Sequence, residues 1–326
     1  FFLLGVGVSA GSTPFLAYMA ERVPERRMAG AAALTWILMI AGIIVTATVA
    51  GSFLDPYSPT RLVQVAFGVT GGAFLLTLIG VAGRSGSEPI HLRSSESSAP
   101  FKEVLDAMWA DPQSRAFATF IFLSMLAYSA QDIILEPYAG AVFGLTPGES
   151  TKIAGLQHGG VLLGMIAGAV GAARWGTLPR WAAAGCAASA LALVALVAMP
   201  ATGSVQGMKG AVFALGLANG VFAVAAIGAM MGLTVRGKAG GAGLRMGFWG
   251  AAQAIAYGLG GVLGAVGSDV ARSTLGSASA GYSAVFAAEA VLFTAAAVLV
   301  LTRVREGSVR RYDALRQAGE AMAVGG

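Results

Sequence analysis

Charged residues, cysteine and histidine are all scarce in this chain of 326 residues. Only 11% of the residues are charged, 56% are hydrophobic, and the mean hydropathy is +0.73. About a quarter of the residues in a typical soluble domain are charged, so this composition excludes an ordinary soluble protein. The single cysteine, Cys186, excludes a disulfide framework and lies in an apolar run, where we expect a packing role.

Recognisable catalytic signals are also missing from the sequence. We find no nucleophile beside a base, no metal-ligand spacing and no phosphate loop. The pair Gly5 and Gly7 follows no expected strand and lacks the third glycine of a dinucleotide fingerprint. We therefore do not expect an enzyme.

Long apolar runs dominate what is present. A helix needs about 20 apolar residues to cross a bilayer. The sequence contains nine such runs, at 1–20, 29–52, 62–83, 115–138, 152–173, 181–200, 210–234, 245–268 and 282–303. These runs predict an all-α polytopic membrane protein.

The basic residues alternate between the two sides that nine spans would create. Of the 21 Lys and Arg residues, 17 fall on the side that holds the carboxyl tail and four on the other. Because cytoplasmic loops are enriched in Lys and Arg, the tail is expected in the cytoplasm and the start of the sequence on the opposite side. The net charge of +5 comes from short scattered clusters, which do not indicate a nucleic-acid partner.

A polar segment, 84–114, divides the spans into two groups. It is rich in Ser, Gly and Pro and ends in a short amphipathic stretch, which predicts a cytoplasmic linker between 1–83 and the six spans of 115–303. His91 in this linker is interpreted as a solvated side chain. The basic tail, 304–326, is expected to bind anionic lipid.

Polar residues inside the fourth span are the strongest functional signal. Gln131, Asp132, Glu136 and Tyr138 follow directly on an apolar run. Ionisable side chains within a membrane are costly and indicate a functional site. Asp132 and Glu136 share one helix face with Tyr128, one turn earlier. That face is expected to meet a cavity, a cofactor or a partner.

Two further spans contribute polar residues at a similar expected depth. Gln157 and His158 lie about 8 to 9 Å from the start of the fifth span, and Glu289 lies at a comparable depth in the last. We expect Asp132, Glu136, His158 and Glu289 to share one layer, with Glu289 on the outer wall of the protein. Asn219 is expected to form a hydrogen bond across helices.

Glycine pairs spaced four residues apart predict close helix contacts. The pairs in the fifth, seventh and eighth spans are Gly164 with Gly168, Gly216 with Gly220 and Gly260 with Gly264. Small residues at this spacing let two membrane helices approach closely.

Four stretches carry a family resemblance. Residues 24–30 resemble the basic turn between the fourth and fifth helices of the major facilitator superfamily. Residues 55–62 (DPYSPTRL), 131–140 (QDIILEPYAG) and 142–151 (VFGLTPGEST) are similar to the PucC/LhaA family, the bacteriochlorophyll delivery branch of that superfamily. The resemblance implies a twelve-helix facilitator fold of which nine helices are present, so that 1–83 would be the last three helices of the first half.

The resemblance also implies a function in photosynthesis. We expect a non-enzymatic factor of the intracytoplasmic photosynthetic membrane of purple bacteria that handles bacteriochlorophyll a or a precursor. Its partners would be light-harvesting antenna polypeptides, the reaction centre and bacteriochlorophyll synthase. Two alternatives stay open: a proton-coupled small-molecule facilitator and a pigment-free scaffold for antenna rings.

Pigment binding would assign roles to the polar residues. Chlorin magnesium takes an axial ligand, and His158 followed by Gly159 and Gly160 is the preferred ligand, because the glycines leave room for a flat ring. The alternative for His158 is a hydrogen bond to Asp132, Glu136 or a backbone carbonyl. Gln131, Gln157, Tyr138 and Glu289 are candidates to face pigment or partner.

Overall fold

The computed structural model describes residues 25–82, 108–234 and 242–304, together with residues 7 and 106. Within these residues all regular structure is α-helical, and eight helices are long and apolar enough to cross a membrane. The prediction of an all-α polytopic membrane protein is confirmed. The expected first span, almost all of the linker and the tail beyond Val304 lie outside the described residues.

The eight helices match the last eight predicted spans and extend beyond most of them. Their bounds are α2 Glu25–Phe53, α3 Pro59–Val81, α5 Pro112–Phe143, α6 Pro147–Arg174, α7 Leu178–Thr202, α8 Val205–Thr234, α9 Ala242–Leu275 and α10 Ala278–Arg303.

Short turns with strong capping residues set where the helices begin. Asp111 accepts hydrogen bonds from the first turn of α5, and Ser58 does the same for α3. Thr146 and Glu149 form a reciprocal capping box at the start of α6. Each of these helices has proline in its first turn, where the missing N–H breaks no helical hydrogen bond.

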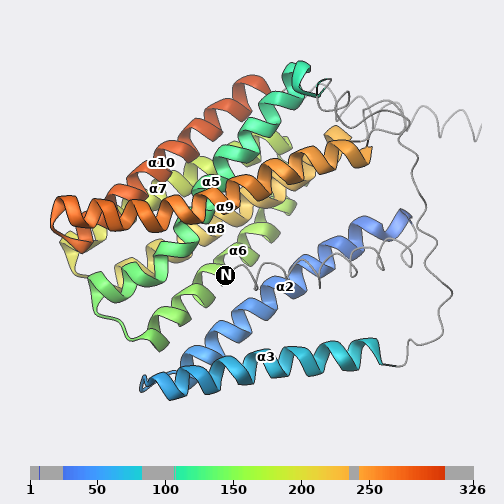
Figure 1. Ribbon diagram of the computed structural model, residues 1–326. Helices are drawn as coiled ribbons and strands as arrows, with labels where there is room; N and C mark the ends of the chain where they lie inside the picture. The colour runs from blue at the N-terminus through green and yellow to red at the C-terminus, as the bar shows by residue number, and fades with distance from the viewer. Residues whose placement is uncertain (1–6, 8–24, 83–105, 107, 235–241, 305–326) are drawn as a thin grey trace, which may run out of the picture.

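Helices α5 to α10 pack into one six-helix unit (Figure 1). Its main contacts are α6 with α8, α7 with α8, α5 with α9, and α10 with both α7 and α5. Helix α2 packs against α6, whereas α3 approaches α2 and has no buried residue. The α2–α3 and α5–α6 loops lie at the same end of the molecule (Figure 1).

Glycines bring α6 and α8 into backbone contact. A Cβ added at Gly164 would collide with the carbonyl of Leu217, and one at Gly220 with the carbonyl of Val161. The α5–α9 contact is built in the same way, because a Cβ at Gly260 would meet the carbonyl of Leu126. The predicted glycine contacts in these spans are confirmed.

Tyr138 lies at the centre of the unit. Its side chain is fully buried, and its hydroxyl donates to the Leu196 carbonyl at 2.8 Å, which joins α5 to α7. Its ring packs edge-on against Phe286 and Tyr282 of α10, with ring centroids 5.0 and 5.9 Å away. The fold therefore already provides apolar contacts for the Tyr138 ring and a hydrogen-bond acceptor for its hydroxyl.

Replacing Gly220 with alanine is expected to destabilise the α6–α8 contact. The added methyl collides with backbone that cannot rotate away, so we expect a loss of roughly 1–3 kcal/mol. Gly210→Ala on the same helix is the matched control, because a Cβ there meets nothing within 4 Å. The unfolding midpoint in detergent checks this, and equal midpoints for the two variants would contradict the packing assigned to Gly220.

Removing the Tyr138 hydroxyl is expected to weaken the link between α5 and α7. Tyr138→Phe keeps the ring contacts but strands the Leu196 carbonyl, at a cost of roughly 0.5–1.5 kcal/mol. Tyr282→Phe is the control, since no hydrogen bond of the Tyr282 hydroxyl is found. The thermal unfolding midpoints of the two variants are compared. A larger drop in the midpoint for Tyr282→Phe would show that the Tyr138 hydrogen bond is not the stabilising contact.

Candidate functional site

Polar side chains of α5, α6 and α9 form a strip in which side-chain interactions join five residues, and His158 continues it two turns further along α6. We call it the polar strip; it comprises Tyr128, Asp132 and Glu136 of α5, Thr151 and His158 of α6, and Tyr257 of α9. Asp132, Glu136 and His158 are half-buried, so they border an accessible face of the protein and not its interior.

Asp132 has a partner on α9 that the sequence did not reveal. The Tyr257 hydroxyl donates to Asp132 Oδ2 at 3.1 Å, and the Tyr257 ring lies 6.3 Å from that of Tyr128. Tyr257 is a lone tyrosine among small residues and lies well over a hundred positions away. Only the register of α5 on α9, which the glycine contacts fix, brings it to Asp132.

Glu136 lies against the start of α6. Its neighbour is Thr151, whose hydroxyl also reaches the Pro147 carbonyl at 2.9 Å. The carboxyls of Asp132 and Glu136 are close enough to interact with each other electrostatically, as their spacing of one turn predicts.

His158 is oriented by its own helix. Its Nδ1 lies 2.9 Å from the Ala154 carbonyl. A carbonyl only accepts, so Nδ1 carries the proton and Nε2 of the neutral ring carries the lone pair. His158 follows Thr151 by two turns on the same side of α6, about 10 Å further along the axis.

The two glycines after His158 have different surroundings. A Cβ at Gly159 would meet nothing within 4 Å, so the space over this residue is open. Gly160 packs against the backbone of Phe213 in the α6–α8 contact. The expectation that both glycines leave room for a ring therefore holds for Gly159 and is wrong for Gly160.

The other sequence-predicted residues lie inside the six-helix unit. Gln131, Gln157, Tyr138 and Glu289 are each at most 2% exposed. Glu289 faces the interior because α10 packs against α5, α7 and α9 along that side. The expectation that Glu289 lies on the outer wall is wrong, because Glu289 is enclosed whereas Asp132, Glu136 and His158 border an accessible face.

Two of the stretches that carry the family resemblance meet at the loops. Asp55 accepts from the Thr146 hydroxyl at 2.8 Å and pairs with Lys152 at 3.7 Å. Gly148 lies directly against the Asp55 carboxyl, where any side chain would collide. These contacts fasten the α2–α3 loop to the start of α6.

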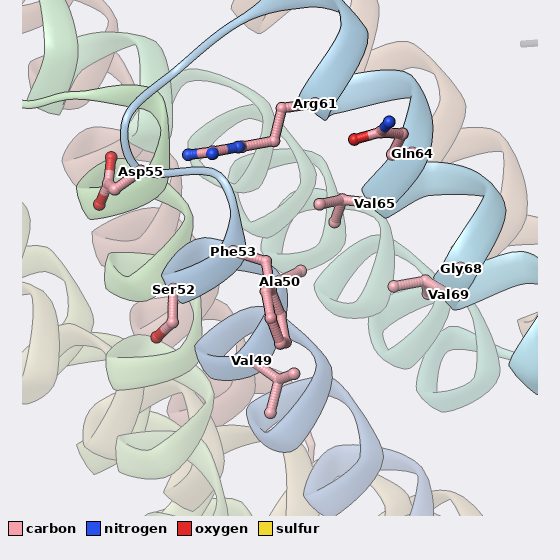
Figure 2. A pocket seen from close by; sticks show the side chains of 10 residues that line it. All are labelled: Val49, Ala50, Ser52, Phe53, Asp55, Arg61, Gln64, Val65, Gly68 and Val69. Atoms are coloured by element: carbon pink, nitrogen blue, oxygen red, sulfur yellow. The ribbon is translucent and has the colours of Figure 1, made fainter.

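A pocket of about 580 Å³ lies between α2 and α3 beside this fastening (Figure 2). Val49, Phe53, Val65 and Val69 form its apolar walls, and Arg61 crosses its mouth (Figure 2). The Arg61 guanidinium donates to the Pro56 carbonyl at 2.9 Å. No residue of the polar strip lines this pocket.

The polar strip is no metal centre by itself. Among the described residues there is no group of three or more His, Cys, Asp or Glu side chains that could hold a metal ion. One imidazole with a free lone pair can bind a metal ion whose other coordination positions are already filled, such as the magnesium of a chlorin.

Comparison with known proteins identifies relatives of this chain. The chain is 49% identical over 304 residues to a protein of Rhodobacter capsulatus called bacteriochlorophyll synthase 44.5 kDa chain, covering 91% of this chain and 69% of that protein. It is 32% identical over 320 residues to Protein PucC of the same species, covering 94% and 68%. Protein PucC of Cereibacter sphaeroides is 26% identical over 323 residues, covering 95% and 68%.

The sequence profile of one family covers nearly the whole chain. The family described as PUCC protein matches residues 1–308, which include all eight helices. The stretches at 55–62 and 142–151 that resembled this family are those that fasten the two loops together. The chain is a multi-pass membrane protein that belongs to the PUCC protein family.

Proposed function

We propose that this protein is a non-enzymatic factor that binds bacteriochlorophyll in the photosynthetic membrane and delivers it to light-harvesting antenna or reaction-centre complexes. The orientation of His158 carries the proposal, because Nδ1 is held by Ala154 and the lone pair of Nε2 is left for a ligand. The relatives support it through their names, one of which refers to bacteriochlorophyll synthase.

The polar strip offers the other groups that a chlorin needs. His158 Nε2 would supply the axial ligand, and the open space at Gly159 would accept the ring beside α6. The hydroxyl of Tyr128 would donate to a carbonyl substituent of the ring. Asp132, held by Tyr257, and Glu136 would supply acceptors.

The basic residues support an orientation for this delivery. Among the described residues, Arg61, Lys152, Lys209 and Arg272 belong to one end of the helices, and Arg115, Arg174, Arg180 and Arg303 belong to the other. We propose that the carboxyl tail faces the cytoplasm. Glu136, near the end of α5, would then lie toward the opposite side, and His158 deeper in the bilayer.

Pigment binding is tested by purification from cells that make bacteriochlorophyll. The protein in mild detergent is expected to retain chlorin absorption in a fixed ratio to protein. Preparations without pigment from such cells would contradict the proposal. They would favour a scaffold that contacts antenna polypeptides without carrying pigment.

His158→Ala is expected to lower bound pigment by roughly tenfold or more, since even outer-shell partners of metal ligands typically cost 10- to 100-fold in affinity. Lys152→Ala is the matched control, because Lys152 is on the same helix and points to Asp55. Pigment per protein and the unfolding midpoint are measured together. Unchanged pigment in folded His158→Ala protein would remove His158 as the ligand.

A further inference from the structure

Among the described residues, five buried side chains have polar atoms without a hydrogen-bond partner. Gln157 and Trp249 are two of them, and the other three lie at one depth inside the six-helix unit. Gln131 and Asn219 are fully buried, and Glu289 is 1% exposed. Both amide atoms of Gln131, the amide nitrogen of Asn219 and both carboxyl oxygens of Glu289 form no hydrogen bond. Each unsatisfied group in a membrane interior costs several kcal/mol, so something must occupy this place.

Contacts between α5 and α10 show that Gln131 and Glu289 lie on facing sides of these two helices. The Tyr138 ring packs on Tyr282 and Phe286 of the antiparallel helix α10. Gln131 lies two turns before Tyr138, and Glu289 lies one to two turns after these aromatic partners. The two side chains therefore come to the same depth.

Helix α9 gives the same register independently. Gly267 faces Val285 of α10, and three residues earlier Gly264 packs against Ala130 of α5. Glu289 lies one turn after Val285 and so reaches the depth of Ala130, the residue next to Gln131 in sequence.

The amide of Asn219 comes to this depth from α8. The Phe222 and Phe293 ring centroids lie 6.0 Å apart, and Asn219 and Glu289 each precede one of these rings by about one turn. The Ser189 hydroxyl of α7 donates to Asn219 Oδ1 at 2.8 Å. Four helices thus each bring one polar side chain to the same depth of the interior. We call Gln131, Ser189, Asn219 and Glu289 the buried cluster.

No described basic side chain balances an ionised Glu289. Arg272 is the nearest in register, because its backbone packs against Gly281, eight residues or about 12 Å along α10 from Glu289. Asp132 and Glu136 lie on the other face of α5 and would add negative charge. The other ionisable side chains that line the interior on neighbouring turns are Tyr138, Cys186 and Tyr282, and none of them is basic.

We propose that this cluster binds a monovalent cation, either a proton or a sodium ion, on Glu289. One positive charge neutralises the single carboxylate, whereas a divalent ion would leave a buried net charge. A proton on one Glu289 oxygen could be donated to Gln131 Oε1, while Gln131 Nε2 donates to the other oxygen. A sodium ion would take the same carboxylate together with the Gln131, Asn219 and Ser189 oxygens.

The site is independent of pigment binding. It lies inside the six-helix unit and uses no residue of the polar strip, so its failure would leave the assignment of His158 untouched.

The test uses the full chain in detergent at neutral pH. The unfolding midpoint is compared in sodium chloride and in N-methylglucamine chloride of equal ionic strength. Infrared spectra record the carbonyl band of protonated carboxyls. Glu289→Gln removes the carboxylate at nearly constant volume. Asp269→Asn is the matched control, because Asp269 is 69% exposed and pairs with Arg272.

A sodium site predicts a higher midpoint in sodium chloride that is lost in Glu289→Gln and kept in Asp269→Asn. A proton site predicts no sodium effect and a protonated-carboxyl band that only Glu289→Gln removes. The absence of both the sodium effect and the protonated-carboxyl band would overturn the proposal.

Gln131→Leu keeps the test decisive if Glu289→Gln does not fold. For a sodium site this variant should raise the sodium concentration needed for half of the stabilisation by about tenfold. For a proton site it should shift the carboxyl band, because the hydrogen bond to the amide is lost. A variant that folds and changes neither readout would also overturn the proposal.

Discussion

A polar group inside a bilayer must find its partners within the protein, and this constraint arranges the interior of the six-helix unit. Ser189 meets Asn219, Tyr138 meets the Leu196 carbonyl and Ser129 donates to the Tyr257 carbonyl. Each contact joins two helices, and glycines let the helices come close enough to make it. The side chains that this network leaves unsatisfied are therefore the ones that point to a ligand.

Two adjacent polar residues of α5 serve two different faces of this helix. Gln131 and Asp132 are neighbours in sequence, yet Gln131 is fully buried inside the unit and Asp132 borders the polar strip with Tyr257. Their directions differ by about 100° because an α-helix has 3.6 residues per turn. One short stretch thus serves an accessible site on one side and an enclosed cluster on the other.

The positions of the membrane spans could be predicted from the sequence, because a run of about 20 apolar residues is typical of a membrane-spanning helix. Glycine spacing also predicted the close contacts at Gly164, Gly220 and Gly260. Which face each helix buries could not be predicted in the same way. Glu289 was expected on the outer wall and is enclosed, because α10 buries that side against three helices.

Long-range pairs were equally hidden from the sequence. Tyr257 carries no local signal, and Asp55 could be recognised as part of a family stretch without any indication that it fastens to Thr146 and Lys152. Both of the loops joined by this fastening lie in stretches that resemble the PUCC family. It holds the α2–α3 hairpin to the start of α6, the helix that presents His158.

The central claim is that the polar strip receives a chlorin through His158. A density map of the protein purified with its pigment tests this most directly. We expect a flat ring beside Gly159, with its magnesium facing His158 Nε2 and its edge toward Asp132 and Tyr257. A ring bound elsewhere, with His158 Nε2 occupied by a protein hydrogen bond, would contradict it.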